Sequence, residues 1–167
     1  MKNWSMKDKR WGEMKIGNTQ LKLKDYGCLV VSLSMLADRF PDNVLDILNR
    51  NNCFDKNGLL ISDLAAKILG LEYLGKGFTL PDHPCIAETN HFAPKIPQHF
   101  FVWLGDSKII DPLDGKEKIN PYHIISFRLF KRKNKPAEKK SLIPITVSKL
   151  PNLKERVNQL LGWFFHD

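Results

Sequence analysis

A cysteine stands between a polar turn and an apolar run in the segment KDYGCLVVSLSML, residues 24–36. Tyr26 and Gly27 lead into Cys28, and the chain is then apolar for most of three helical turns. A free cysteine is often a small hydrophobe that only fills space in a core. A cysteine at a helix N-terminus is also a candidate nucleophile, because the field of the helix favours the thiolate. The segment by itself leaves both interpretations open.

A histidine and an aspartate that could serve such a cysteine occur in QHFFVWLGDSKIIDPLDG, residues 98–115. This segment predicts a hairpin with its turn near 105–106, so His99 and Asp111, each about six residues from the turn, should lie opposite one another. An imidazole held by a carboxylate and aimed at a thiol is the arrangement of base, orienting group and nucleophile in cysteine peptidases. His91 offers a rival His-Phe pair, but no carboxylate follows it at hairpin spacing.

The elements that would hold these residues are predicted as helices first and strands second. Apolar residues recur at helical spacing in three segments, which are 28–39, 42–50 and 61–70. Ser62 is expected to cap the third helix, and Gly70 to end it. Short segments rich in β-branched and aromatic residues follow Gly77, at 83–89, 99–105, 107–112 and 123–130. The chain is therefore predicted to be α+β, with an N-terminal helical half packed on an antiparallel sheet.

The order of several short motifs resembles that of a known family. These motifs are WSMKDKRW (4–11), KIGNTQLKLKDYGC (15–28), CLVVSLSML (28–36), HFFVW (99–103) and DPLDG (111–115). Over residues 4 to about 128 they are similar in order and spacing to papain-like cysteine peptidases related to the bacteriocin-processing (double-glycine leader) peptidases, especially the stand-alone bacterial and phage type. The resemblance implies a papain-like fold with Cys28 as nucleophile, His99 as base and Asp111 as the orienting residue.

The chain departs from this family at the position that helps to bind the oxyanion. The family has a glutamine where this chain has Met6, whose thioether has no hydrogen to donate. Losing one oxyanion donor typically lowers turnover by about 10²- to 10³-fold. Gln20, eight residues before Cys28, is a candidate substitute, and the backbone N–H of Cys28 is a further donor. Two hypotheses follow: a cysteine peptidase, or a catalytically impaired peptidase fold that serves as a binding or structural part of an assembly such as a virion.

The expected reaction is cleavage of a peptide bond, in a protein or in a peptidoglycan cross-bridge, and it requires no cofactor. The three cysteines and the histidines show no spacing typical of a metal site or a disulfide framework. Cys53 and Cys85 are therefore predicted to be packing residues. The N-terminal segment lacks the apolar run of a signal peptide, and no run approaches the roughly 18 apolar residues of a membrane span. A cytoplasmic or virion-associated protein is expected.

The net charge of +8 is distributed unevenly along the 167 residues. Residues 131–167 hold nine Lys and Arg against three Asp and Glu, whereas residues 1–130 hold seventeen against fifteen. We therefore assign a peptidase-type domain to 1–130 and a basic linker to 131–141. The nearly neutral domain argues against a nucleic-acid partner, because nucleic-acid-binding domains carry a basic patch on their main face. Association with nucleic acid through the linker alone is a third hypothesis.

The last segment, 142–167, is predicted to contain a strand and a C-terminal amphipathic helix. Within 151–166, apolar residues recur at helical spacing: Leu153, Val157, Leu160, Leu161, Phe164 and Phe165. Such a helix could dock on its own domain, bind a groove of a partner protein, mediate self-association or lie on a membrane surface. Its polar face is mixed in charge rather than strongly basic, which disfavours the membrane surface.

Overall fold

The computed structural model describes residues 1–93 and 96–132, which belong to one compact unit. The helices come first, as α1 (Leu23–Tyr26), α2 (Cys28–Ala37), α3 (Pro41–Arg50) and α4 (Ser62–Leu69). The strands follow, as β1 (Leu71–Gly77), β2 (Cys85–Ala93), β3 (Ile96–Gly105), β4 (Lys108–Asp111), β5 (Lys116–Ile119) and β6 (Ser126–Arg132). This part of the chain is α+β, as its sequence predicted.

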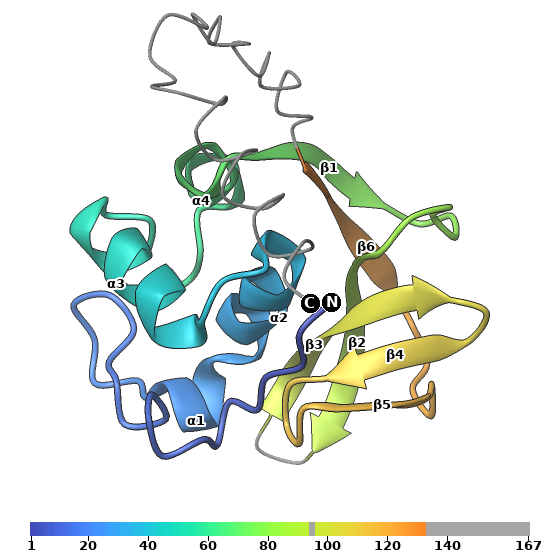
Figure 1. Cartoon of the computed structure of the whole chain (residues 1–167), viewed down its shortest axis with the longest axis horizontal. Coiled ribbons are helices and arrows are strands. Elements are labelled where there is room, and N and C mark those ends of the chain that lie inside the picture. The colour runs from blue at the N-terminus through green and yellow to red at the C-terminus, as the bar shows by residue number, and fades with distance from the viewer. Residues whose placement is uncertain (94–95, 133–167) are drawn as a thin grey trace, which may run out of the picture. The chain divides into compact units, whose positions relative to one another are not determined.

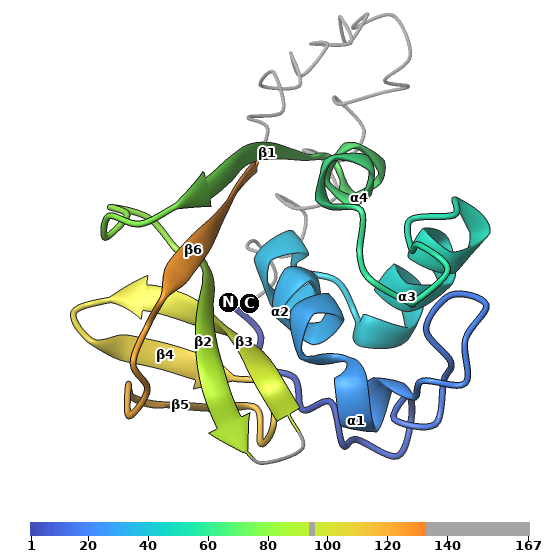
Figure 2. The same ribbon diagram turned by 180° about the vertical axis from the view of Figure 1, so that it is seen from behind.

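The strands form one antiparallel sheet in the order β1-β6-β2-β3-β4-β5. The helices gather on one side of this sheet, with α2 between α3 and the strands (Figures 1 and 2). The main core fills the space between helices and sheet, and α2 packs chiefly on β3. A second, smaller cluster contains Cys85, Ala87, Phe101, Trp103, Ile109 and Phe127. The alternation of side chains along β3 explains the two clusters, because neighbouring residues point to opposite faces.

The helix ends follow mostly from local sequence. Helix α2 is buried nearly throughout and ends where Asp38 adopts a left-handed conformation, two residues before the predicted end. Helix α3 begins one residue earlier than predicted, at Pro41, because a proline suits the first position of a helix. Ser62 is the first helical residue of α4 rather than its cap. Gly70 ends α4 with a φ of +73°, as predicted.

The sequence did not predict the two edge strands, β1 and β5. Strand β1 contains two glycines and a bulge between Tyr73 and Lys76, and β5 is a mostly exposed KEKI segment. An edge strand pairs on one side only, and polar residues there discourage pairing with other chains. Periodicity detects a strand by its buried face, so these two segments gave no signal.

The predicted basic linker (131–141) and the C-terminal strand and helix (142–167) lie outside the described residues, with one small exception. Lys131 and Arg132 are described, and they form the end of β6. The side chain of Arg132 donates a hydrogen bond to the carbonyl oxygen of Leu36 at 2.9 Å, which ties this strand end to α2. Among the residues that the structure describes, no helix is both long and apolar enough to cross a bilayer.

Candidate active site

Cys28 is the first residue of α2 and is half-buried. It follows Gly27, where a Cβ atom would come within 2.4 Å of the carbonyl oxygen of Leu23. Only glycine therefore fits the junction that leads from α1 directly into α2. The first N–H groups of a helix have no acceptor within the helix, and the helix dipole is positive at this end. Cys28 thus lies beside backbone donors and a favourable field for negative charge.

The structure brings His99 to both Cys28 and Asp111. The imidazole is only 2% exposed, and its Nε2 lies 3.0 Å from Oδ1 of Asp111. Burial by itself would lower the pKa of His99, but hydrogen bonds with Asp111 and with the Cys28 thiol group raise it to about 9. Because Nε2 of His99 bonds the Asp111 carboxylate, the other ring nitrogen, Nδ1, is the atom that can exchange a proton with the Cys28 thiol. The three residues singled out by the sequence are therefore in one hydrogen-bonded group.

The strand register that brings His99 to Asp111 differs from the prediction, which placed these two residues about opposite one another. The two turn residues, 106–107, have positive φ values of 48° and 59°, as in a type I′ hairpin. Val102 pairs with Ile110, so His99 lies two residues beyond the position opposite Asp111. Side chains alternate between faces, so this even offset keeps both residues on the same face of the sheet. Diagonal partners of this kind remain within reach of long side chains.

Asp111 is completely buried and accepts four hydrogen bonds. Its Oδ1 accepts from His99 and from the backbone N–H of Leu113, both at 3.0 Å. Its Oδ2 accepts from the Tyr122 hydroxyl at 2.5 Å and from the Lys118 ammonium at 2.9 Å. Burial would raise the pKa of Asp111, but these partners hold it well below the usual range of a carboxyl group. The carboxylate is therefore ionised and fixed in position.

Sequence reasoning missed Tyr122 and Lys118. Lys118 belongs to β5, and Tyr122 follows in a segment fixed by two backbone-to-side-chain hydrogen bonds with Asn120, each at 3.0 Å. The Tyr122 ring lies edge-on to His99, with 5.8 Å between the ring centroids. A polar edge strand and a short loop have no periodic pattern, so we know of no sequence signal that would have marked these residues.

Met6 and Gln20, the two residues considered for the oxyanion site, lie outside the pocket beside Cys28. The Met6 side chain is 2% exposed and packs in the main core. Its backbone N–H donates to the carbonyl oxygen of Pro112 at 2.7 Å, so the N-terminal segment runs beside the turn after Asp111. Gln20 is exposed at the surface. Neither residue is among those that line the pocket beside Cys28.

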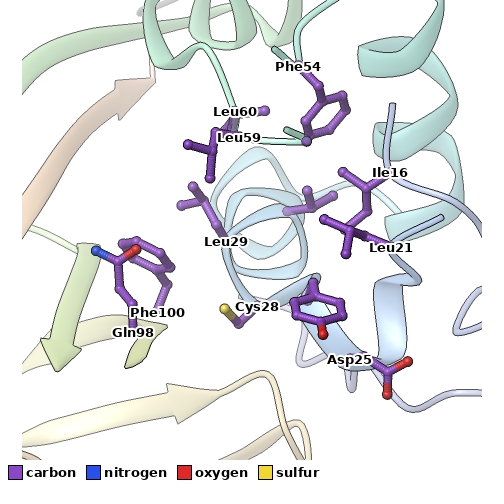
Figure 3. A pocket seen from close by; sticks show the side chains of 13 residues that line it. Ile16, Leu21, Asp25, Cys28, Leu29, Phe54, Leu59, Leu60, Gln98 and Phe100 are labelled. Carbon is purple, nitrogen blue, oxygen red and sulfur yellow. The ribbon is translucent and has the colours of Figure 1, made fainter. Parts of the chain in front are cut away.

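This pocket is an apolar cavity of about 270 Å³ that opens beside the thiol of Cys28. Its apolar walls come from α2, the segment after α3, the loop before α1 and strand β3, and include Leu21, Leu29, Phe54, Leu59, Leu60 and Phe100. Figure 3 shows the Cys28 sulfur turned toward the side of the pocket formed by Gln98 and Phe100. The candidate nucleophile therefore faces a space that a ligand can enter.

The other two cysteines have a different environment. Cys53 and Cys85 are both fully buried, and burial raises the pKa of each thiol, that of Cys85 to about 12. Thiols of this kind are inert packing groups. Within residues 1–93 and 96–132, no three histidine, cysteine or acidic residues are grouped so that they could hold a metal ion.

We compared the chain with known protein families and with curated proteins, and it matches none of them. The chemistry of the site is therefore inferred from the geometry of its residues.

The contact between His99 and Asp111 should make stability depend on pH. The pKa of His99 is raised from 6.5 to about 9, so its contribution is complete below pH 6.5 and is lost as the pH rises through about 9. In a Cys28→Ala chain, which removes the thiol next to the imidazole, we expect the free energy of unfolding to fall by about 1–3 kcal/mol between pH 6 and 9.5. This fall in unfolding free energy is smaller than the full rise in the His99 pKa would give, because Cys28 causes part of that rise and is absent from the variant.

Urea denaturation at the two pH values measures this drop. The control is the double variant Cys28→Ala/His99→Gln, which lacks the titrating imidazole and should show a smaller drop. Equal pH dependence in the two chains would contradict a raised pKa for His99.

Proposed function

We propose that this chain is a cysteine peptidase of papain-like type, in which Cys28 attacks the scissile carbonyl group. The observation that carries the proposal is the group of Cys28, His99 and Asp111, in which a helix-terminal thiol and a buried carboxylate bond the same buried imidazole. A packing role for Cys28 does not require an ionised carboxylate at the other side of that imidazole. Cys28 is only partly buried and lines the adjoining pocket, which gives a substrate access to it.

The chemistry follows the usual course of a thiol peptidase. The Cys28 thiolate adds to the carbonyl carbon, and the carbonyl oxygen becomes an oxyanion near the backbone N–H groups at the start of α2. Protonated His99 then gives its proton to the leaving amine, and the C–N bond breaks to leave a thioester. Water, deprotonated by neutral His99, hydrolyses the thioester to a carboxylic acid and restores the thiol. Asp111 stabilises the imidazolium and fixes its orientation throughout.

One observation favours a second candidate function, a peptidase fold retained for binding or assembly. The buried Met6 offers no side-chain donor for the oxyanion, and Gln20 lies at the surface. Without either side chain, the backbone N–H groups at the start of α2 would have to stabilise the tetrahedral intermediate. Turnover should be about 10²- to 10³-fold lower than in an enzyme with the side-chain donor.

A search for new peptide termini tests the proposal. The purified chain is incubated with a protein-derived peptide library, and termini that arise over hours are identified by mass spectrometry, which tolerates slow turnover. We expect new termini with the intact chain and none with Cys28→Ala. Cys85→Ala is the matched control, since it removes a buried thiol away from the pocket, and it should retain cleavage. If the intact chain produces no termini beyond those of Cys28→Ala, the binding function is favoured instead.

A further inference from the structure

The two oxygens of the Asp111 carboxylate face different nitrogen groups. Oδ1 lies 3.0 Å from the imidazole of His99, and Oδ2 lies 2.9 Å from the ammonium nitrogen of Lys118. Burial would lower the pKa of Lys118, but its contact with Asp111 raises it, so this side chain stays charged while cysteine and histidine titrate. One carboxylate therefore serves two cations whenever the imidazole is protonated.

Fixing the position of Asp111 does not require a positive charge at Oδ2. The carboxylate also accepts hydrogen bonds from the Tyr122 hydroxyl and from the backbone N–H of Leu113, which are neutral donors. Burial and the bond to Asp111 raise the pKa of Tyr122, so its hydroxyl keeps its proton. The ammonium group of Lys118 differs from these donors in one respect, because it offsets part of the negative charge that acts on His99.

We propose that Lys118 is a positioning residue that limits the basicity of His99 by sharing the charge of Asp111. This inference rests on the proposed peptidase function and deepens it by naming what sets the working pH of its base. His99 has to protonate the leaving amine and then, once the thioester has formed, to deprotonate water. A carboxylate without a second cation favours the imidazolium more strongly, which leaves less of the neutral imidazole that the second step needs.

The groups that carry or can carry charge around His99 come from several elements. Strand β2 places the uncharged Thr89 opposite His99. The described titratable side chains come from α2, from β4 and β5, and from the segments that flank β5: Cys28, Asp111, Lys118, Asp114 and Tyr122. In the thioester intermediate the sulfur carries no charge, so the balance between Asp111 and Lys118 has the largest influence on the proton affinity of His99.

Titration of His99 by NMR tests the inference without any need for turnover. The parent chain carries Cys28→Ala, so that no thiolate contributes, and the ring signal of His99 is assigned by its loss in His99→Gln. Lys118→Met removes the charge, and Lys118→Gln removes it but keeps a hydrogen-bond donor for the carboxylate. We expect both to raise the pKa of His99 by about 0.5–1.5 units, a range that allows for the 33% exposure of the Lys118 side chain to water.

Two control variants separate the charge of Lys118 from other effects of replacing it. Lys118→Arg keeps the charge, and its His99 should titrate within about 0.3 pH units of the parent chain. Lys108→Met removes an equal charge from β4, but Lys108 is exposed and its side chain lies on the opposite face of the sheet from Asp111. This control should also titrate like the parent. Urea denaturation shows that each variant is folded at the pH values used.

The same shift should appear in the hydrolysis of a thioester at Cys28, in chains that keep this cysteine. p-Nitrophenyl acetate transfers its acetyl group to the Cys28 sulfur and releases p-nitrophenolate, and mass spectrometry then follows the hydrolysis of the acetyl thioester to acetate. The rate of this hydrolysis should rise with pH to a plateau, because neutral His99 deprotonates the attacking water. In Lys118→Met, the midpoint of the rise should lie about 0.5–1.5 pH units higher.

The outcomes distinguish this inference from the proposed function. If Lys118→Met and Lys118→Gln leave the pKa of His99 unchanged or lower it, the inference is overturned and the peptidase proposal stands. If Lys118→Gln titrates like the parent and only Lys118→Met is shifted, the ammonium group acts as a hydrogen-bond donor rather than as a charge, and the inference is again overturned. If His99→Gln loses the acetyl group from Cys28 as fast as the intact chain, the proposed function fails, while the NMR titration still decides the role of Lys118 on its own.

Discussion

Replacing His99 with alanine should lower the rate at which iodoacetamide modifies Cys28 at pH 6 by about 10- to 100-fold. Without the imidazole, Cys28 has no neighbouring base to accept its proton, and a free thiol in water is less than about 1% thiolate at pH 6. A thiolate without an imidazolium partner is intrinsically a better nucleophile, which offsets part of the loss. Cleavage of peptides should fall further, because no group would then protonate the leaving amine.

Labelling followed by digestion and mass spectrometry measures this rate for each cysteine separately. His83→Ala is the matched control, because His83 also bonds an aspartate, Asp82 at 2.7 Å, but has no cysteine partner. His99→Gln is a second variant that preserves more of the side-chain volume in the buried position. Labelling of Cys28 at the intact rate in both His99 variants would mean that the imidazole does not activate the thiol.

Replacing Asp111 with alanine should destabilise the fold by about 3–5 kcal/mol. The carboxylate is fully buried, and its loss leaves the Tyr122 hydroxyl, the Lys118 ammonium and the His99 ring without their common acceptor. Buried donors that lose their acceptor retain the full cost of desolvation. The pKa of His99 should also fall, since Asp111 is one of the partners that raise it, so labelling of Cys28 at pH 6 should slow.

Urea denaturation measures the loss of stability. A double-mutant cycle of positions 111 and 118 shows how much of that loss comes from the contact between Asp111 and Lys118. In Asp111→Asn, which keeps the shape but removes the charge, we expect a smaller loss of about 1–3 kcal/mol. Adding Lys118→Met to Asp111→Asn should recover part of that loss, because it removes an ammonium group that has lost its buried carboxylate partner. Asp114→Ala is the control: this exposed residue lies 3.5 Å from Lys118, and its loss should change stability by less than about 0.5 kcal/mol. Equal losses at 111 and 114 would contradict a special role for the buried carboxylate.

The local features of the fold could be predicted because their causes are local. The apolar run after Cys28 predicts a buried helix, and the positive φ of Gly70 ends α4 where the sequence indicated. The β-branched and aromatic segments predicted four of the strands, and turn residues predicted the hairpin between β3 and β4. Each of these signals depends on backbone preference or on periodic burial, which neighbours in sequence determine.

The register of the hairpin could not be predicted in the same way. A symmetric hairpin put His99 opposite Asp111, but the turn is centred one residue later and β3 has a bulge beside it. The two side chains meet because the resulting offset is even and leaves them on one face. An odd offset would have pointed them to opposite faces and removed the site. Bulges depend on packing across the sheet, which one segment of sequence does not contain.

The sequence by itself determined which residues have the chemistry of a thiol nucleophile, a base and a carboxylate, and the order of helices and strands that carry them. Tertiary structure decided what surrounds that group: Tyr122 and Lys118 hold Asp111, Met6 is placed in the core, and Gln98 faces the pocket. These features depend on contacts between segments far apart in the chain. The partners of a buried charge are set by whichever donors the folded sheet brings to it, and that is a property of the packed molecule rather than of any local pattern.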